Sequence, residues 1–285
     1  MRVPSTQWRI KAEIGKFIIW TILVGYTFLA LVPVLWTLST SFKPRSETLE
    51  MPPSLIPHNF TLDNYVKVFQ KTPILLSLRN SSIIVAGTLF LCLTLGLLAA
   101  YGLSKFFNFN SQKFFLYFAL ATRAVAPAAL VVPFMIIGRR LHILDTFLIL
   151  ILADSYMWLP FLIWLMKGFI DVIPEELVDA SKIDGCSNLG ILRRVIIPLS
   201  IPGLVSVAIL IFIDTWNELL FAMALAESIS VKPITTTMTY FYTDIYTVYG
   251  WMTAAGIVGV IPAVIFMLFF QRYIVKGVIA GAVKG

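Results

Sequence analysis

The sequence has 285 residues, of which 59% are hydrophobic and 13% are charged, and its mean hydropathy is +0.88. These values exclude an ordinary soluble domain, because a soluble fold of this size cannot hide so much apolar surface from water. The formal net charge of +7 does not indicate nucleic-acid binding, since the basic residues are spread among the loops and form no single patch.

Six predominantly apolar stretches are each long enough to cross a membrane, which takes about 20 residues as a helix. None shows the alternation of polar and apolar residues that marks a strand of a membrane barrel. We therefore expect an all-α polytopic membrane protein with six transmembrane helices, in one domain covering residues 1–285. The expected spans are about 17–38, 82–103, 114–137, 146–166, 204–226 and 251–271.

The first apolar stretch is too long for the core of a signal peptide, and no small-residue cleavage site follows it. We expect it to remain as an anchor helix. Prolines at 127, 133, 160 and 262 predict kinks in the later spans, although prolines are frequent in membrane helices in general.

The basic residues favour one orientation of these helices. If the N-terminus lies inside, thirteen lysines and arginines fall in cytoplasmic segments and eight in external ones, as the positive-inside rule predicts. Arg139 and Arg140, at the outer end of the third stretch, run against this bias. The charges and the even number of spans together predict that both termini are cytoplasmic.

Two polar segments, at 39–80 and 227–250, are then external loops. The first contains a mixed apolar and basic stretch at 64–71, which fits either a helix lying along the membrane interface or a plain connector. The second contains an aromatic run at 239–246. This run is suited to stacking on sugar rings, but it also fits the aromatic belt of an ordinary membrane protein.

The segment at 167–203 carries the signals of two short helices. Pro174 and the acidic residues after it favour a helix N-terminus, and Gly185 supplies a stop. Ser187 can cap a second helix over about 188–196, before two prolines lead into the fifth span. Two short helices joined at a glycine make a rigid cytoplasmic knob, which suits a docking surface, although a folded loop without a task would show the same pattern.

This segment resembles the EAA loop of the membrane subunits of binding-protein-dependent ABC importers. The motif of that family is Glu-Ala-Ala, three residues, Gly, nine residues and Ile-x-Leu-Pro. Here Asp179 stands for the glutamate and Ser181 for the second alanine, and the spacing from Gly185 to Pro198 matches. Val195 and Ile197 replace the isoleucine and leucine, with little change in size.

Further stretches resemble the carbohydrate-importer permeases that are similar to the smaller channel subunit of the maltose transporter. Their order along nearly the whole chain supports the resemblance more than any one of them does. They are Phe60–Tyr65, Asn80–Val85, Ala99–Leu103, Trp216–Glu218 and Gly281–Gly285.

The resemblance implies a type I ABC importer permease of the bacterial cytoplasmic (inner) membrane, carrying a sugar or oligosaccharide. Its implied partners are a second, similar permease in a heterodimer, two ATPase subunits, which bind ATP and Mg, and an extracytoplasmic substrate-binding protein. It also implies that the knob seats in a cleft of the ATPase. The implied coupling residues are Glu176, Asp179, Ala180, Ser181, Asp184, Gly185, Ser187 and Pro198.

Polar residues inside the apolar stretches are the candidates for the translocation path, because charges in a membrane are costly and usually face a cavity or a partner. Asp214 and Glu218 lie four residues apart and predict a polar stripe on one helix face. A structural contact with a neighbouring helix would explain this stripe as well. The full set of candidates is Arg123, Asp154, Asp214, Trp216, Asn217 and Glu218.

The sequence predicts neither an enzyme nor a metal protein. No glycine-rich phosphate loop ending in Gly-Lys-Ser or Gly-Lys-Thr is present, so we expect no cofactor in this chain, and the energy must come from another subunit. Cys92 and Cys186 lie where neither a disulfide nor a metal cluster is plausible. The rival hypotheses are a self-sufficient secondary carrier that uses intramembrane carboxylates and a membrane scaffold without transport.

Overall fold

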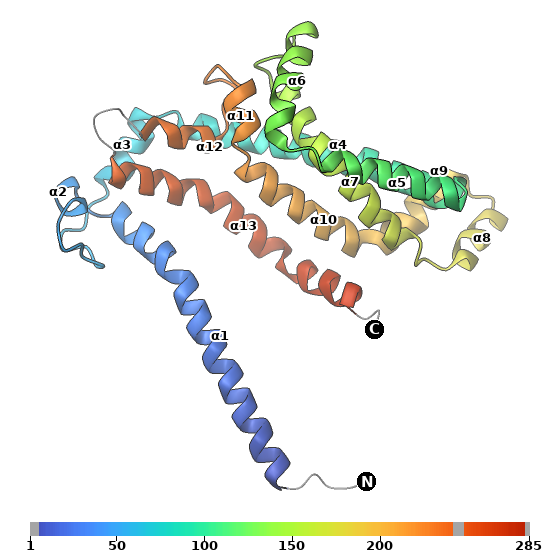
Figure 1. Cartoon of the computed structure of the whole chain (residues 1–285), viewed down its shortest axis with the longest axis horizontal. Helices are drawn as coiled ribbons and strands as arrows, with labels where there is room; N and C mark the ends of the chain where they lie inside the picture. The colour runs from blue at the N-terminus through green and yellow to red at the C-terminus, as the bar shows by residue number, and fades with distance from the viewer. Residues whose placement is uncertain (1–5, 242–247, 283–285) are drawn as a thin grey trace. The chain divides into compact units, whose positions relative to one another are not determined.

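The computed structural model describes residues 6–241 and 248–282, and the regular elements in those ranges are helices (Figure 1). Within them, five helices are long and apolar enough to cross a membrane, and a bent pair makes a sixth if it is counted as one span. This confirms the predicted all-α polytopic class. The aromatic run at 239–246 lies mostly outside the described residues.

The chain divides into two compact units. The first consists of residues 1–71 and 241–258, and it contains α1 (Thr6–Ser41), α2 (Arg45–Thr48), α3 (Asp63–Lys71) and the first turns of α13 (Tyr249–Ala282). In this unit Asn64 donates from its side-chain amide to the carbonyls of Ser41 and Lys43, at 2.9 and 2.8 Å, which ties α3 to the end of α1.

The second unit, residues 72–240 and 259–285, contains the remaining elements. These are α4 (Ile74–Phe106), α5 (Phe109–Arg123), α6 (Pro127–Arg140), α7 (Phe147–Ile170), α8 (Glu175–Ile183), α9 (Asn188–Ile191), the π-helical turn η1 (Leu192–Ile196), α10 (Ile197–Asn217), α11 (Leu220–Leu225), α12 (Ile234–Thr237) and η2 (Met238–Phe241).

Three long helices, α4, α7 and α10, pack against one another and form the centre of the second unit (Figure 1). Small residues allow the close approach. A Cβ atom on Gly203 of α10 would lie 2.6 to 2.8 Å from ring atoms of Phe169 on α7, which leaves room for glycine alone. Apolar side chains of all three helices, including Leu97, Leu162 and Val207, fill the interior.

The third apolar stretch, predicted as a span at 114–137, is divided into two helices and is not one continuous helix. α5 ends at Arg123, α6 begins at Pro127, and their axes differ by 93°. The cause is Pro127, because a residue before proline avoids the helical conformation, and Ala126 has a ψ of 133°. The other three prolines of the predicted kinks, at 133, 160 and 262, lie inside helices.

The fifth apolar stretch also differs from the expected 204–226. The helix runs without interruption from Asn188 to Asn217, so the second short helix of the knob continues directly into the membrane helix. A proline inside an α-helix clashes with the carbonyl four residues back. Before Pro198 the chain avoids this with the π-helical turn, in which the Ile197 N–H donates to the carbonyl of Leu192, five residues back.

Candidate functional site

The knob, residues 175–191, is built around a left-handed glycine. α8 ends at Ile183, and Gly185 has a φ of +80°, which a residue with a side chain adopts only with strain. The Gly185 N–H donates to the carbonyl of Lys182 and the Cys186 N–H to that of Ser181, both at 3.0 Å. This pair of bonds is the Schellman motif, which closes a helix C-terminus and reverses the chain.

The second half of the knob begins at a side-chain cap. Ser187 Oγ accepts a hydrogen bond from the Gly190 N–H at 3.2 Å, as the sequence predicts. Val178 and Ile191 are buried against the core of α4 and α7, and the Tyr101 hydroxyl on α4 donates to the Asn188 carbonyl at 3.3 Å. The knob is therefore fixed on its inner face.

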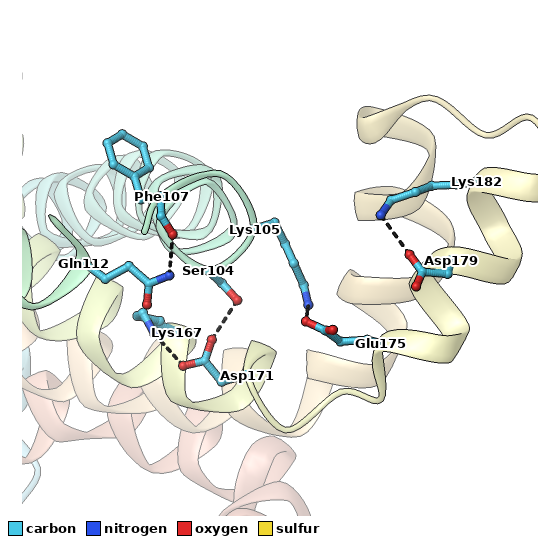
Figure 2. A network of polar contacts seen from close by, with 9 residues as sticks. All are labelled: Ser104, Lys105, Phe107, Gln112, Lys167, Asp171, Glu175, Asp179 and Lys182. Atoms are coloured by element: carbon cyan, nitrogen blue, oxygen red, sulfur yellow. Dashed lines mark hydrogen bonds and ion pairs between the residues drawn. The ribbon is translucent and has the colours of Figure 1, made fainter. Parts of the chain in front are cut away.

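A polar network holds the base of the knob (Figure 2). Asp171, just after α7, accepts from Ser104 Oγ of α4 at 2.7 Å and from Lys167 Nζ at 2.5 Å. Lys105 forms an ion pair with Glu175 at 3.9 Å, across the gap from α4 to the first turn of α8. A charge-assisted hydrogen bond thus joins the end of α4 to the end of α7, and a long ion pair joins α4 to the first turn of α8.

The outer face of the knob is open. Of the predicted coupling residues, Ser181 is half-buried and the other seven are exposed: Glu176, Asp179, Ala180, Asp184, Gly185, Ser187 and Pro198. Two large apolar residues on either side of Gly185, Ile183 (87%) and Leu189 (58%), are also exposed. Asp179 pairs with Lys182 at 2.9 Å, and this hydrogen bond and charge raise the pKa of the lysine.

The second candidate region is a polar cluster between α7 and α10. Asp214 accepts a hydrogen bond from Trp158 Nε1 at 2.8 Å. The guanidinium of Arg123, at the end of α5, lies 4.8 Å from the ring centres of both Trp158 and Phe161. Arg123 therefore makes a cation–π contact with the indole whose N–H binds Asp214.

Asp154 lies deeper, on α7, and is only 5% exposed. It lines a cavity of about 10 Å³ with Ser81, Thr215 and Glu218, which is room for about one water molecule. Within the described ranges, the buried Thr215 Oγ1 has no hydrogen-bond partner. The carboxyl groups of Asp154 and Glu218 thus face the same small cavity.

Glu218 does not share a helix face with Asp214, and the stripe predicted from their spacing is wrong. α10 ends at Asn217, and Glu218 is extended, with a ψ of 129°. Its two carboxylate oxygens accept from the N–H groups of Phe221, at 2.7 Å, and Ala222, at 3.0 Å. The glutamate therefore caps α11 and breaks the helix that was expected to continue.

The two other path candidates point in different directions. Trp216 is buried, donates from Nε1 to the Gly259 carbonyl at 3.1 Å, and stacks on Phe212. Asn217 is exposed and donates to the Ile213 carbonyl at 2.7 Å. Asp214 and Asn217 thus lie on an exposed face of α10, whereas Trp216 fixes α10 to the part of α13 in the same unit.

Sequence reasoning missed two residues. Trp158 links Arg123 to Asp214, and its position four residues after Asp154 on α7 was an available signal. Asp145 has a φ of 57°, and its Oδ1 accepts from the N–H groups of Glu227 at 2.8 Å and Ser228 at 2.9 Å. Its pKa is lowered: desolvation opposes the shift, but these bonds and the charge of Lys232 together outweigh it.

Among the described residues, the cysteines and the acidic side chains show no arrangement for a metal. Cys92 is buried, Cys186 is half-buried, and both are free thiols. In the described part of the chain, no group of three or more His, Cys, Asp or Glu side chains is placed to hold a metal ion.

Comparison with known sequences places the whole chain beside one class of proteins. The family model described as binding-protein-dependent transport system inner membrane component matches residues 92–280. The trehalose transport system permease protein SugB of Mycobacterium tuberculosis is 36% identical, over 93% of this chain and 95% of its own. The sulfoquinovosyl glycerol transport system permease protein SmoH of Agrobacterium fabrum is 31% identical, over 90% and 89%.

A solved structure has the same fold. A chain of a bacterial ABC transporter that imports the acidic polysaccharide alginate superposes with a TM-score of 0.79 at 21% identity, covering 96% of this chain and 99% of that one. The match in fold therefore covers nearly the whole chain.

Proposed function

We propose that this chain, which belongs to the family of binding-protein-dependent transport system inner membrane components, carries a sugar or oligosaccharide across the bacterial cytoplasmic membrane. The chain is a multi-pass permease subunit of an ABC importer, and a separate ATPase subunit hydrolyses the ATP. The observation that supports a carbohydrate is the set of permeases similar over nearly their whole length, which are named for trehalose, sulfoquinovosyl glycerol and diacetylchitobiose.

The knob is the proposed contact with the ATPase. Its outer face combines exposed apolar side chains, Ile183 and Leu189, with the open surface at Gly185, where an added Cβ would meet nothing within 4 Å. Exposed apolar groups of this kind indicate a partner surface. Because the inner face is pinned to α4 and α7 and the second half runs on into α10, a push on the knob reaches the membrane helix without passing through a flexible joint.

The exposed face of α10 is the proposed contribution to the translocation path. Asp214 and Asn217 lie on this face. Trp158 donates a hydrogen bond to Asp214 and makes a cation–π contact with Arg123. Asp154 and Trp216 are buried and Glu218 caps α11, so we expect these three residues to stabilise the helices of the path without lining it. Polar groups on an otherwise apolar helix face are expected where the helix lines a pathway or meets a second subunit.

The proposed assembly has this permease beside a second, similar one in a heterodimer. Two ATPase subunits bind ATP and Mg on the cytoplasmic side, where both termini and the knob lie, and an extracytoplasmic binding protein delivers the sugar. The distribution of lysine and arginine among the loops supports this orientation.

Reconstitution of the complete importer in liposomes tests the proposal. Radiolabelled trehalose, maltose and diacetylchitobiose are offered with the cognate binding protein and ATP inside the vesicles, and uptake of at least one is expected to require both. Uptake by this chain alone, driven by an ion gradient, would instead establish a secondary carrier. An importer that moves none of these sugars but moves another class of solute would overturn the carbohydrate assignment.

A further inference from the structure

A cavity in the first unit has no part in the coupling knob or the α10 face. It encloses about 270 Å³ between the end of α1, the chain that follows it and the first turns of α13. Its lining includes the aromatic residues Trp36 and Tyr249 and the hydroxyl residues Thr40 and Thr253. Ligand pockets combine apolar walls with a few fixed polar groups in this way.

Two buried ionisable side chains complete the lining. Lys43 is 3% exposed and Glu47 is 6% exposed. Charges are rarely buried to this degree unless partners hold them. Glu47 is held by the N–H groups of His58, at 2.8 Å, and Asn59, at 3.2 Å, and by Ser54 Oγ at 3.1 Å.

The ammonium group of Lys43 has more N–H donors than it has acceptors among the described residues. Its Nζ donates to the Ser54 carbonyl and lies 5.5 Å from the centre of the Trp36 ring. An ammonium group carries three donors, and among the described residues the Ser54 carbonyl is the acceptor that Nζ meets. The remaining donors are available to an occupant of the cavity.

The chemistry of the lining favours a neutral polyhydroxylated ligand. One positive and one negative side chain lie on the same cavity, so a ligand with a net charge gains little from the pair. Hydroxyl groups of a ligand can accept from Lys43 and donate to Thr40 and Thr253, whose own hydroxyl protons bind backbone carbonyls. The apolar face of a sugar ring can pack on an aromatic side chain. We propose that this outer pocket binds a sugar ring of the transported carbohydrate at the external surface.

This inference rests on the proposed function and on the proposed orientation. An interfacial aromatic belt alone would explain Trp36 and Tyr249. It would not explain why a lysine and a glutamate are buried beside them with their polar groups fixed around a cavity.

Saturation-transfer NMR on the complete importer in nanodiscs, without the binding protein, tests the pocket with trehalose, maltose and diacetylchitobiose as probes. The variants are Trp36→Leu and Tyr249→Leu. The matched control is Trp20→Leu, which removes a 66% exposed tryptophan from the same helix outside the pocket. Loss of an aromatic anchor is expected to weaken binding about tenfold, so saturation transfer should fall in both pocket variants and persist in the control.

Equal signals in Trp36→Leu and Trp20→Leu, or no signal from any probe in the wild type, would overturn the proposal. Saturation transfer to the headgroup of added phosphatidylglycerol, lost in Trp36→Leu, would instead identify a lipid site and also overturn it. ATP-driven uptake is measured in parallel. Normal uptake without binding at the pocket refutes the pocket alone, whereas no uptake of any sugar refutes the proposed function.

Discussion

The knob and the turn at 218–241 are both short helical segments joined to α10, but they are held in opposite ways. In the knob the bonds that define the shape are local: Gly185 to Lys182, Cys186 to Ser181 and Gly190 to Ser187. In the turn they reach far along the chain, because Asn80 donates to the carbonyls of Ile229 and Lys232, and Asp145 accepts from Glu227 and Ser228.

This difference indicates that the knob can move as a rigid unit, whereas the turn is fixed by bonds to distant parts of the chain. A segment closed by its own bonds keeps its shape when a partner pushes it, whereas a segment held by distant groups keeps its shape only while those groups stay together. The knob is therefore suited to transmitting motion. The conformation of the turn depends on the relative positions of α4, α7 and α10.

The largest expected effect is at Gly185. Gly185→Asp should leave the protein inserted in the membrane but uncouple ATP hydrolysis from uptake, because the added side chain projects into open space where it can obstruct a partner, and because it strains the left-handed turn of the knob. Sugar uptake and ATPase activity in the same vesicles measure this. Gly185→Asn separates bulk from charge, since asparagine and aspartate have nearly the same size and tolerate positive φ alike, and it should fail like aspartate.

Gly168→Ala on α7 is a control for adding a side chain in open space without a change of backbone conformation, because Gly168 also has nothing within 4 Å but lies inside a helix, and it should transport normally. Wild-type uptake by Gly185→Asp would refute the role of the knob in coupling.

Gly203→Ala tests the packing of α10, the helix that continues from the knob, against α7. The new methyl group would lie 2.6 Å from the Phe169 ring, and overpacking of this kind costs about 1–3 kcal/mol. Thermal unfolding of the purified importer should show the loss. Gly102→Ala on α4, with open space around it, should be neutral or slightly stabilising. Equal melting temperatures for both variants would contradict the close packing of α7 on α10.

Glu218 and Asp214 should respond differently if only one faces the path. Glu218→Ala removes the cap of α11 and should cost about 1 kcal/mol of stability, while Glu218→Gln keeps one acceptor and should transport nearly normally. Asp214→Asn should reduce uptake with little change in melting temperature, because this exposed acid does not cap a helix. The reverse pattern in uptake would assign the path to Glu218.

The smallest effect is expected from acid on the turn. Because the folded pKa of Asp145 lies below its ordinary value of 3.8, its contribution is complete above that value and is lost as the pH falls through the lowered pKa. The protection factors of the amides of residues 225–231, which are corrected for the intrinsic pH dependence of hydrogen exchange, should therefore be unchanged between pH 8 and 5 and fall only below about 4. Asp145→Asn should remove most of this dependence. Protection that falls near pH 6 would point to another group.

The sequence predicted the helical class, the end of α8 near Gly185 and the cap at Ser187, because glycine, proline and capping residues act within a few positions of themselves. It failed where distant groups decide the outcome. The capping of α11 by Glu218 depends on where α10 stops, and the link between Arg123 and Asp214 depends on packing of α5 and α10 on α7. The 93° bend at Ala126 was locally encoded by Pro127, but its size was not.

The π-helical turn before Pro198 also determines how far α10 is rotated about its own axis relative to the knob. One additional residue in an α-helix corresponds to about 100° of rotation about the helix axis. Ile191, Leu192 and Ile196 are buried around this turn, so its rotational setting is locked by packing. A helix without a break carries torsion as well as displacement. We therefore expect ATPase closure to twist α10 about its axis, and with it the face that bears Asp214.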